Sequence, residues 1–148
     1  MREFESFRPL YDPTAVQPMR DELTRVGVDE LTTSEAVDEV LGKDEGTALL
    51  VVNSVCGCAA GNARPGVMIA LQNGLIPDRL TSVFAGQDKE ATEKARSYMS
   101  EFPPSSPCIA VFQDGRVHTI IERHNVEGRS PQDIATMLVN SFNSCCKR

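Results

Sequence analysis

The sequence lacks a long apolar run, an apolar segment near its start and an excess of basic charge. Its longest apolar stretch, residues 47–52, is far shorter than the roughly 20 residues that a membrane-spanning helix needs. Residues 1–10 contain no apolar core of the kind found in export signals. Fifteen Lys and Arg against 21 Asp and Glu give a formal charge of -6, whereas proteins that bind nucleic-acid phosphates normally carry a basic face. We therefore expect a cytoplasmic protein that binds neither a membrane nor nucleic acid.

Internal repeats and low-complexity tracts are also absent from the sequence. Its 148 residues, 41% hydrophobic and 24% charged, suffice for one domain with a real core and are too few for two ordinary domains. The five cysteines are an odd number, and the cytosol keeps structural disulfides reduced. We therefore expect the cysteines to be catalytic, redox-sensing or metal-binding rather than a disulfide framework.

The hydrophobic pattern predicts alternating strands and helices. Residues 47–53 are apolar on both faces, which is typical of a central strand. Further strands are predicted at residues 79–85, 108–112 and 116–122, the last two joined as a hairpin by an Asp-Gly turn. The predicted helices cover residues 18–26 with Pro18 in the first turn, 33–41, 58–73 with a kink at Pro65, 88–102 with Asp88 as N-cap, and 131–145.

This order of elements predicts an α/β fold. Right-handed crossovers place the first two strands side by side and parallel, and the hairpin extends the sheet antiparallel. We expect one domain over residues 1–148, with a central mixed sheet of about four strands flanked by helices. Residues 1–45 are expected to form a helical N-terminal extension packed on this core.

The motif Cys56-Gly57-Cys58 follows the most buried predicted strand. Ligands of open α/β sheets collect at the carboxyl ends of the strands, so Cys56 is a candidate reactive residue. A helix that begins near Cys58 would direct N–H groups and its positive dipole end at the sulfur and favour the thiolate, which is the nucleophile of thiol-disulfide exchange. Gly57 leaves the turn sterically free, so that Cys58 can attack a mixed disulfide on Cys56. The small ring is expected to give an easily reduced disulfide. The alternative is that both cysteines merely pack at a helix start.

Two residues before the predicted hairpin fit the same chemistry. A cis peptide bond at Pro107 would set this loop beside the nucleophile and expose the backbone of Ser106 for pairing with a substrate strand. An ordinary trans proline is the alternative. Cys108 is expected to pack inside the sheet.

The remaining candidates are less sharply defined. Cys145 continues the apolar face of the last helix and Cys146 is expected to be more exposed; either is a candidate secondary resolving thiol. Lys89, Lys94 and Arg96 are expected to belong to a solvated helix face. Residues 47–55 contain no Asp or Glu, so the sequence assigns no proton path to Cys58.

Residues 51–66, around the Cys-Gly-Cys motif, closely resemble the signature region of the bacilliredoxins. Residues 103–107, 122–124 and 127–128 also resemble that family, as do Tyr11 and residues 16–20, so the resemblance covers nearly the whole chain. It implies a thioredoxin-like fold and the removal of bacillithiol from protein mixed disulfides, with disulfide isomerase activity in some members.

The resemblance also implies roles for particular residues. Cys56 corresponds to the nucleophile, Cys58 to the resolving thiol and Pro107 to the cis proline, while Cys145 or Cys146 corresponds to a cysteine near the C-terminus of family members. We therefore expect a thiol-disulfide oxidoreductase that needs no metal or organic cofactor. Its partners would be bacillithiolated or disulfide-containing client proteins and the low-molecular-weight thiol itself, and we expect a monomer or weak dimer. The alternatives are a protein disulfide isomerase and a metal-binding protein that uses thiolates.

Overall fold

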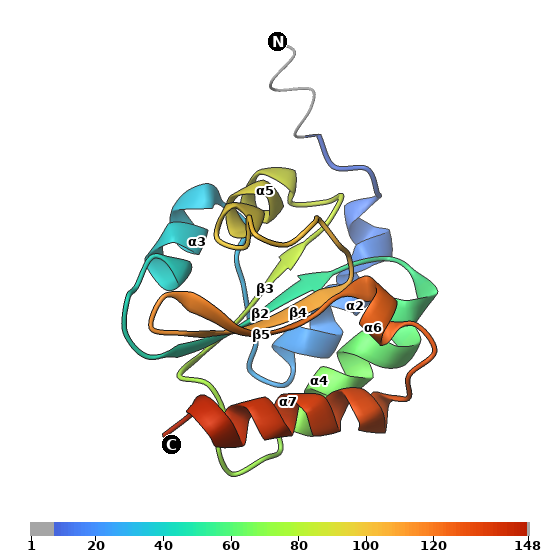
Figure 1. Ribbon diagram of the computed structural model, residues 1–148. Helices are drawn as coiled ribbons and strands as arrows, with labels where there is room; N and C mark the ends of the chain where they lie inside the picture. The colour runs from blue at the N-terminus through green and yellow to red at the C-terminus, as the bar shows by residue number, and fades with distance from the viewer. Residues whose placement is uncertain (1–7, 148) are drawn as a thin grey trace.

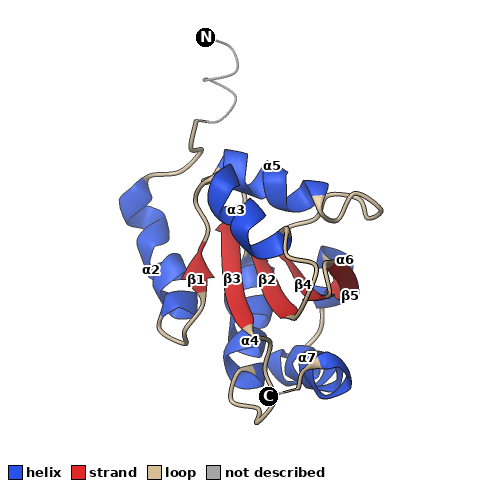
Figure 2. Ribbon diagram, turned by 90° about the vertical axis from the view of Figure 1, so that its left-hand side faces the viewer, coloured by secondary structure: helices blue, strands red, loops and turns tan. Residues whose placement is uncertain are grey.

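The structure is a computed structural model in which residues 8–147 are described. A five-stranded sheet, in the order β1-β3-β2-β4-β5, lies between two layers of helices (Figures 1 and 2). The strands are β1 (Asp29–Glu30), β2 (Thr47–Asn53), β3 (Arg79–Phe84), β4 (Cys108–Gln113) and β5 (Arg116–Ile121). The helices are α2 (Pro13–Thr24), α3 (Ser34–Leu41), the π-helical segment η1 (Ala59–Ala63), α4 (Arg64–Ala70), α5 (Lys89–Ser97), α6 (Arg123–Val126) and α7 (Pro131–Cys145).

Strand β2 is the centre of the sheet. It pairs parallel with β3 and antiparallel with β4, and β5 pairs antiparallel with β4, as the order of elements predicts. Every residue of β2 is buried, which explains why the strand is apolar on both faces. The expectation of about four strands is one too few, because β1 adds a two-residue parallel edge strand beside β3 within the segment expected to be helical.

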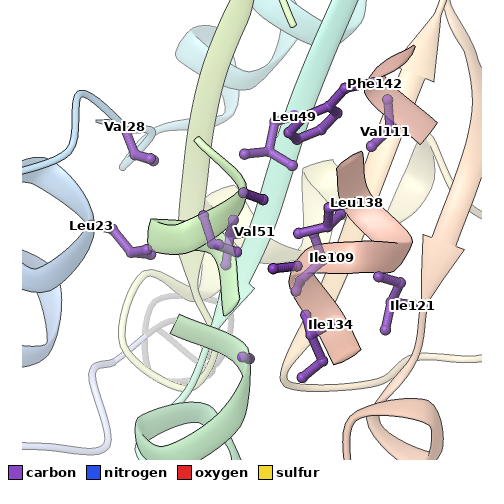
Figure 3. Packing of buried hydrophobic residues seen from close by; sticks show 14 of the residues in the cluster. Leu23, Val28, Leu49, Val51, Ile109, Val111, Ile121, Ile134, Leu138 and Phe142 are labelled. Carbon is purple, nitrogen blue, oxygen red and sulfur yellow. The ribbon is translucent and has the colours of Figure 1, made fainter. Parts of the chain in front are cut away.

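Alternate residues of β2 build two separate cores. Leu49 and Val51 point to the layer formed by α2, α4 and α7, where Leu138 and Phe142 of α7 join them (Figure 3). Leu50 points to the opposite layer, which α3 and α5 cover (Figure 2). Burial on both faces fixes β2, so the residue that follows it is held in a defined place.

The helix starts differ from the sequence predictions at three points. Helix α2 begins at Pro13 because the Asp12 carboxylate caps it by accepting from the Thr14 N–H, so Pro18 lies inside the helix rather than in its first turn. Pro65 lies in the first turn of α4 rather than inside one continuous helix over 58–73, because the π-helical segment η1 ends at Ala63 and α4 ends at Ala70. The side chain of Asp88 does not cap α5.

The carboxylate of Asp88 instead pairs with Arg20 of α2. Two guanidinium nitrogens of Arg20 donate to Asp88 at 2.8 and 3.1 Å, and one also contacts Glu30 at 2.9 Å. The guanidinium lies 5.2 Å from the ring centre of Phe84. These contacts join α2 to β1 and to the start of α5. Across the described residues, no helix is both long enough and apolar enough to span a bilayer.

Candidate active site

Cys56 lies just beyond the carboxyl end of β2, at the start of a helix. Its backbone carbonyl accepts hydrogen bonds from the N–H groups of Ala59 at 3.1 Å and Ala60 at 3.2 Å, which is the first helical turn. Gly57 is exposed, and a side chain at its position would meet no atom within 4 Å. The buried strand thus delivers Cys56 to a helix N-terminus at an open surface, as the sequence predicts.

The two cysteine sulfurs of the motif lie 2.7 Å apart, and both residues are partly exposed. Burial alone would raise the pKa of Cys56, but hydrogen bonds from the Cys58 thiol, from the Ser54 hydroxyl and from backbone N–H groups of Ala59 and Cys58 lower it below its ordinary value. Cys56 is therefore the better nucleophile of the pair near neutral pH.

Cys58 is shifted in the opposite direction. Burial, the hydrogen bond to Cys56 and the negative charge on Cys56 raise the pKa of the Cys58 thiol, while the positive charge of Arg123 opposes that rise. One thiol is thus favoured as thiolate and its neighbour as protonated thiol. This division matches the roles of nucleophile and resolving residue in disulfide exchange.

A buried arginine supports the loop between β2 and the motif. Arg64 is 1% exposed, and its Nη1 donates to Asn53 Oδ1 and to the Ser54 carbonyl, both at 2.9 Å. Its Nε lies 3.3 Å from the Glu22 carboxylate. The Ser54 hydroxyl in turn accepts from the N–H of Cys56 at 3.2 Å. Arg64 therefore fixes the two residues that lead into the reactive cysteine.

The loop before β4 contains the cis peptide bond that was predicted. The Ser106–Pro107 bond is cis. The Ser105 hydroxyl accepts from the backbone N–H of Arg123 at 2.7 Å, and Arg123 Nη1 donates to the Ser106 carbonyl at 3.4 Å. The start of α6 is therefore attached to this loop. The positive charge of Arg123 also interacts with the charges of Cys56 and Cys58.

Cys108 is a core residue, as predicted. It is 3% exposed and packs in the apolar cluster under α3 and α5. Burial raises the pKa of its thiol to about 12, with a further rise caused by the charge of Glu122. A thiol of this kind is protonated near neutral pH and is a poor nucleophile.

The tail cysteines lie at the other end of the sheet. The sulfurs of Cys145 and Cys146 are 4.0 Å apart, and Cys146 interacts with Thr47, the first residue of β2. Cys146 is more exposed than Cys145, as expected, but at 8% against 4% both residues are buried, and burial raises the pKa of Cys146 to about 11. The structure therefore brings neither residue to Cys56, and the arrangement gives no support to a resolving role within the same chain.

Two further expectations concern ligands and charge. Within residues 8–147, no three His, Cys, Asp or Glu side chains are grouped so that they could hold a metal ion. Arg96 does not belong to the solvated face of α5, because its Nε is buried and its Nη2 donates to the Ser105 carbonyl at 3.4 Å. No sequence pattern distinguishes Arg96 from its neighbours, since it occurs among the exposed charges of α5.

Comparison with known proteins agrees with this geometry. The family model described as disulphide isomerase matches residues 11–146. A bacilliredoxin of Cytophaga hutchinsonii is 54% identical over 129 residues, which is 87% of this chain and 95% of that protein. A bacilliredoxin of Staphylococcus saprophyticus is 49% identical over 137 residues, 93% of this chain and 94% of that protein.

A solved structure shows the fold class. Thioredoxin O2 from Arabidopsis thaliana, in its oxidized state, superposes on this chain with a TM-score of 0.55 at 15% sequence identity. The match covers 80% of this chain and 96% of the thioredoxin chain. At this identity the likeness establishes a thioredoxin-like fold and no more. Taken with the sequence relatives, it means that the chain belongs to the bacilliredoxin family and is a thiol-disulfide oxidoreductase.

Proposed function

We propose that this protein removes a low-molecular-weight thiol from mixed disulfides on protein cysteines, with bacillithiol as the first candidate thiol. The observation that carries the proposal is the pair Cys56 and Cys58, whose sulfurs are 2.7 Å apart and whose pKa values move in opposite directions. The name of the relatives, bacilliredoxin, supports the choice of thiol. We place the reaction in the cytosol, where thiols are kept reduced.

In the first step, the Cys56 thiolate attacks the sulfur of the small thiol within the mixed disulfide. The bond between client and small thiol breaks, and the client cysteine departs as a thiolate that takes a proton. Cys56 is now joined to the small thiol through a disulfide bond. In the second step, the Cys58 sulfur loses its proton and attacks Cys56. The small thiol leaves, and a Cys56–Cys58 disulfide remains for an external dithiol or thiol reductant to reduce.

The electrostatics of Cys56 and Cys58 explain why the two exchange steps occur in this order. Cys58 stays protonated at first, partly because of the hydrogen bond to Cys56 and the charge on it. Once Cys56 is part of a disulfide its charge is gone, so this opposition to Cys58 ionisation disappears while the favourable charge of Arg123 remains. Cys58 thus becomes a stronger nucleophile only after the mixed disulfide has formed.

The client cysteine would approach over the open surface of the motif. Gly57 has free space around its α-carbon, which allows close contact with a client. The backbone of Ser106, before Pro107, is placed in our proposal to pair with an extended client segment by adding a short strand-like contact. No metal or organic cofactor enters these steps, and a monomer or weak dimer suffices for them.

Isomerisation of protein disulfides is the second candidate function. The description of the matching family as disulphide isomerase favours it. The same Cys56 thiolate would attack a protein disulfide, and a client thiol would then displace Cys56, so that no net oxidation or reduction occurs. In this reaction Cys58 only attacks a mixed disulfide on Cys56 that does not rearrange, and so releases the client.

The test is the release of bacillithiol from a reporter protein with one modified cysteine, followed by intact-protein mass. Wild type, Cys56→Ser, Cys58→Ser and Cys108→Ala are compared, the last as a control that removes a thiol buried in the core under α3 and α5. We expect no release with Cys56→Ser, a bacillithiol adduct on Cys56 in Cys58→Ser, and wild-type release with Cys108→Ala. Release that persists in Cys56→Ser would contradict the mechanism. Reshuffling of a scrambled disulfide protein without bacillithiol release would favour isomerisation.

A further inference from the structure

A surface hollow lies beside the active-site loop, between the end of α5 and the start of α6. Its volume is about 410 Å³, and its walls include Arg96, Ser105, Ser106, Glu122 and Arg123. Figure 1 shows α6 next to the loop that leads into β4. A hollow of this volume is within the range of small-molecule sites, which are typically about 300–1,000 Å³.

Arg96 contributes a positive charge to this hollow, and within residues 8–147 no carboxylate lies within 4 Å of its guanidinium nitrogens. Its Nε is buried without a hydrogen-bond partner in that range, and its one side-chain hydrogen bond there is the long contact to Ser105. Burial lowers the pKa of Arg96. A partly buried guanidinium without an anion is unfavourable, so a protein that retains one generally uses it to bind a negative group.

Arg123 forms the rim of the same hollow. Its side chain is about half exposed, its Nε donates to Glu127 at 2.7 Å, and its Nη1 reaches Ser106. The hydrogen bond to Glu127, followed by the charges of Cys56 and Cys58, raises the pKa of Arg123. The residue therefore stands between the reactive thiols and the hollow.

The acidic residues of the hollow already have partners. Glu127 pairs with Arg123 through Nε, and Glu122 caps α6 through its side chain and lies 3.8 Å from His124. Neither carboxylate lies within 4 Å of a guanidinium nitrogen of Arg96, so within residues 8–147 Arg96 has no ion-pair partner. Since the guanidinium is planar and has several donors, it is suited to a carboxylate.

We propose that this hollow is an anion subsite in which Arg96 and Arg123 bind a carboxylate of the low-molecular-weight thiol while its sulfur reacts at Cys56. The inference rests on the proposed function, because the ligand is the thiol part of the mixed disulfide. The volume favours a small thiol over an acidic segment of a client protein. Arg123 links the two parts of the site, since its charge acts on both cysteines and its side chain borders the hollow.

The test compares two mixed disulfides of one reporter protein that differ only in charge. One carries glutathione and the other carries glutathione diethyl ester, in which the same skeleton has its carboxylates masked. The quantity measured is the ratio of kcat/KM values for the two substrates in each variant. Because both values come from the same protein preparation, the ratio does not depend on the fraction of folded protein.

We expect wild type to favour the carboxylate substrate about 10-fold, and Arg96→Gln and Arg123→Gln to bring the ratio to within about 2-fold of unity, mainly through KM. The matched control is Lys94→Gln, which removes one positive charge from α5 at an exposed pair with Asp38 outside the hollow. It should keep the wild-type ratio. Thiol alkylation of Arg123→Gln against pH separates any change in Cys56 ionisation from the change in preference.

Three results would overturn the inference. A wild-type ratio near unity would show that carboxylates are not recognised, and equal slowing of both substrates in Arg96→Gln would show a purely structural role. Release of bacillithiol but of neither glutathione compound would mean that selection depends on another part of the thiol. In these cases the proposed function stands, whereas failure to release any of the three thiols would remove the proposed function as well.

Discussion

Replacement of Arg64 by Met tests whether the buried guanidinium holds the entrance to the reactive loop. Met fills much of the same space but donates no hydrogen bond. The Ser54 carbonyl loses a partner at 2.9 Å, and a buried group left unpaired costs about 1–3 kcal/mol. The variant also loses the charge-assisted hydrogen bond from Arg64 to Asn53 Oδ1. That oxygen still accepts from the Ser54 N–H at 2.9 Å, so the loss costs less than leaving a buried acceptor without any hydrogen bond.

Together these losses predict that Arg64→Met lowers the free energy of unfolding by about 2–4 kcal/mol. Glu22 loses its partner too, but its side chain is 30% exposed and can be rehydrated, so it adds less than about 1 kcal/mol. Urea unfolding followed by circular dichroism measures the change. With a slope of about 2 kcal/mol/M, the midpoint falls by about 1–2 M urea.

The matched control is Glu22→Gln, which removes the charge of the partner and leaves the donors of Arg64 in place. It leaves the buried guanidinium without its carboxylate, but the hydrogen bonds of Arg64 to Asn53 and Ser54 persist, so it should cost about 1–2 kcal/mol and less than Arg64→Met. The argument would be refuted by a cost of Arg64→Met below about 0.5 kcal/mol, or by equal costs for the two variants. In folded Arg64→Met, alkylation of Cys56 should need a higher pH than in wild type, since the Ser54 hydroxyl that stabilises its thiolate is less well placed.

Three other outcomes follow from the geometry. Alkylation of Cys56 by iodoacetamide should reach half its maximal rate at a lower pH than alkylation of a cysteine in a short unstructured peptide, because the pKa of Cys56 is lowered; an equal or higher midpoint would be inconsistent with the site. Gly66→Ala places a methyl 2.6 Å from Ile134 and should destabilise the protein by about 1–3 kcal/mol in urea unfolding, while Gly61→Ala, with no atom within 4 Å, should not. Cys108, with a pKa of about 12, should stay unlabelled at pH 8 in the folded protein, as peptide mapping would show.

The sheet could be predicted because its central strand carries its own signal. Residues 47–53 are apolar on both faces, and only burial between two helix layers explains that pattern. Strand β1 escaped prediction because Asp29 and Glu30 have no strand-like side chains; their pairing depends on β3, which is far along the chain. Pro18 was a misleading helix start, since the Asp12 cap lies upstream of it.

The reactive cysteines could be predicted, whereas their supporting arginines could not. Cys56 follows a buried strand and precedes a helix, and both signals are local in the sequence. Arg64 and Arg96 act through contacts with Asn53 and Ser105, which depend on how each helix packs against the loop beside it. A charged residue on a helix gives the same sequence pattern whether it is solvated or buried, so composition does not separate the two cases.

Cys56 and Cys146 lie near opposite ends of β2, and their thiols differ in reactivity. β2 has seven residues, so at about 3.3 Å per residue its two ends are about 20 Å apart. Cys56 follows the carboxyl end, where hydrogen bonds from Cys58, from Ser54 and from backbone N–H groups lower its pKa, while Cys146 contacts Thr47 at the other end, where burial raises its pKa to about 11. A sulfur attack requires direct contact, so the tail pair cannot resolve a mixed disulfide on Cys56 without a large movement of α7. The neighbouring Cys58 needs no such movement, since its sulfur lies 2.7 Å from that of Cys56, and this supports the proposed assignment of the resolving step to Cys58.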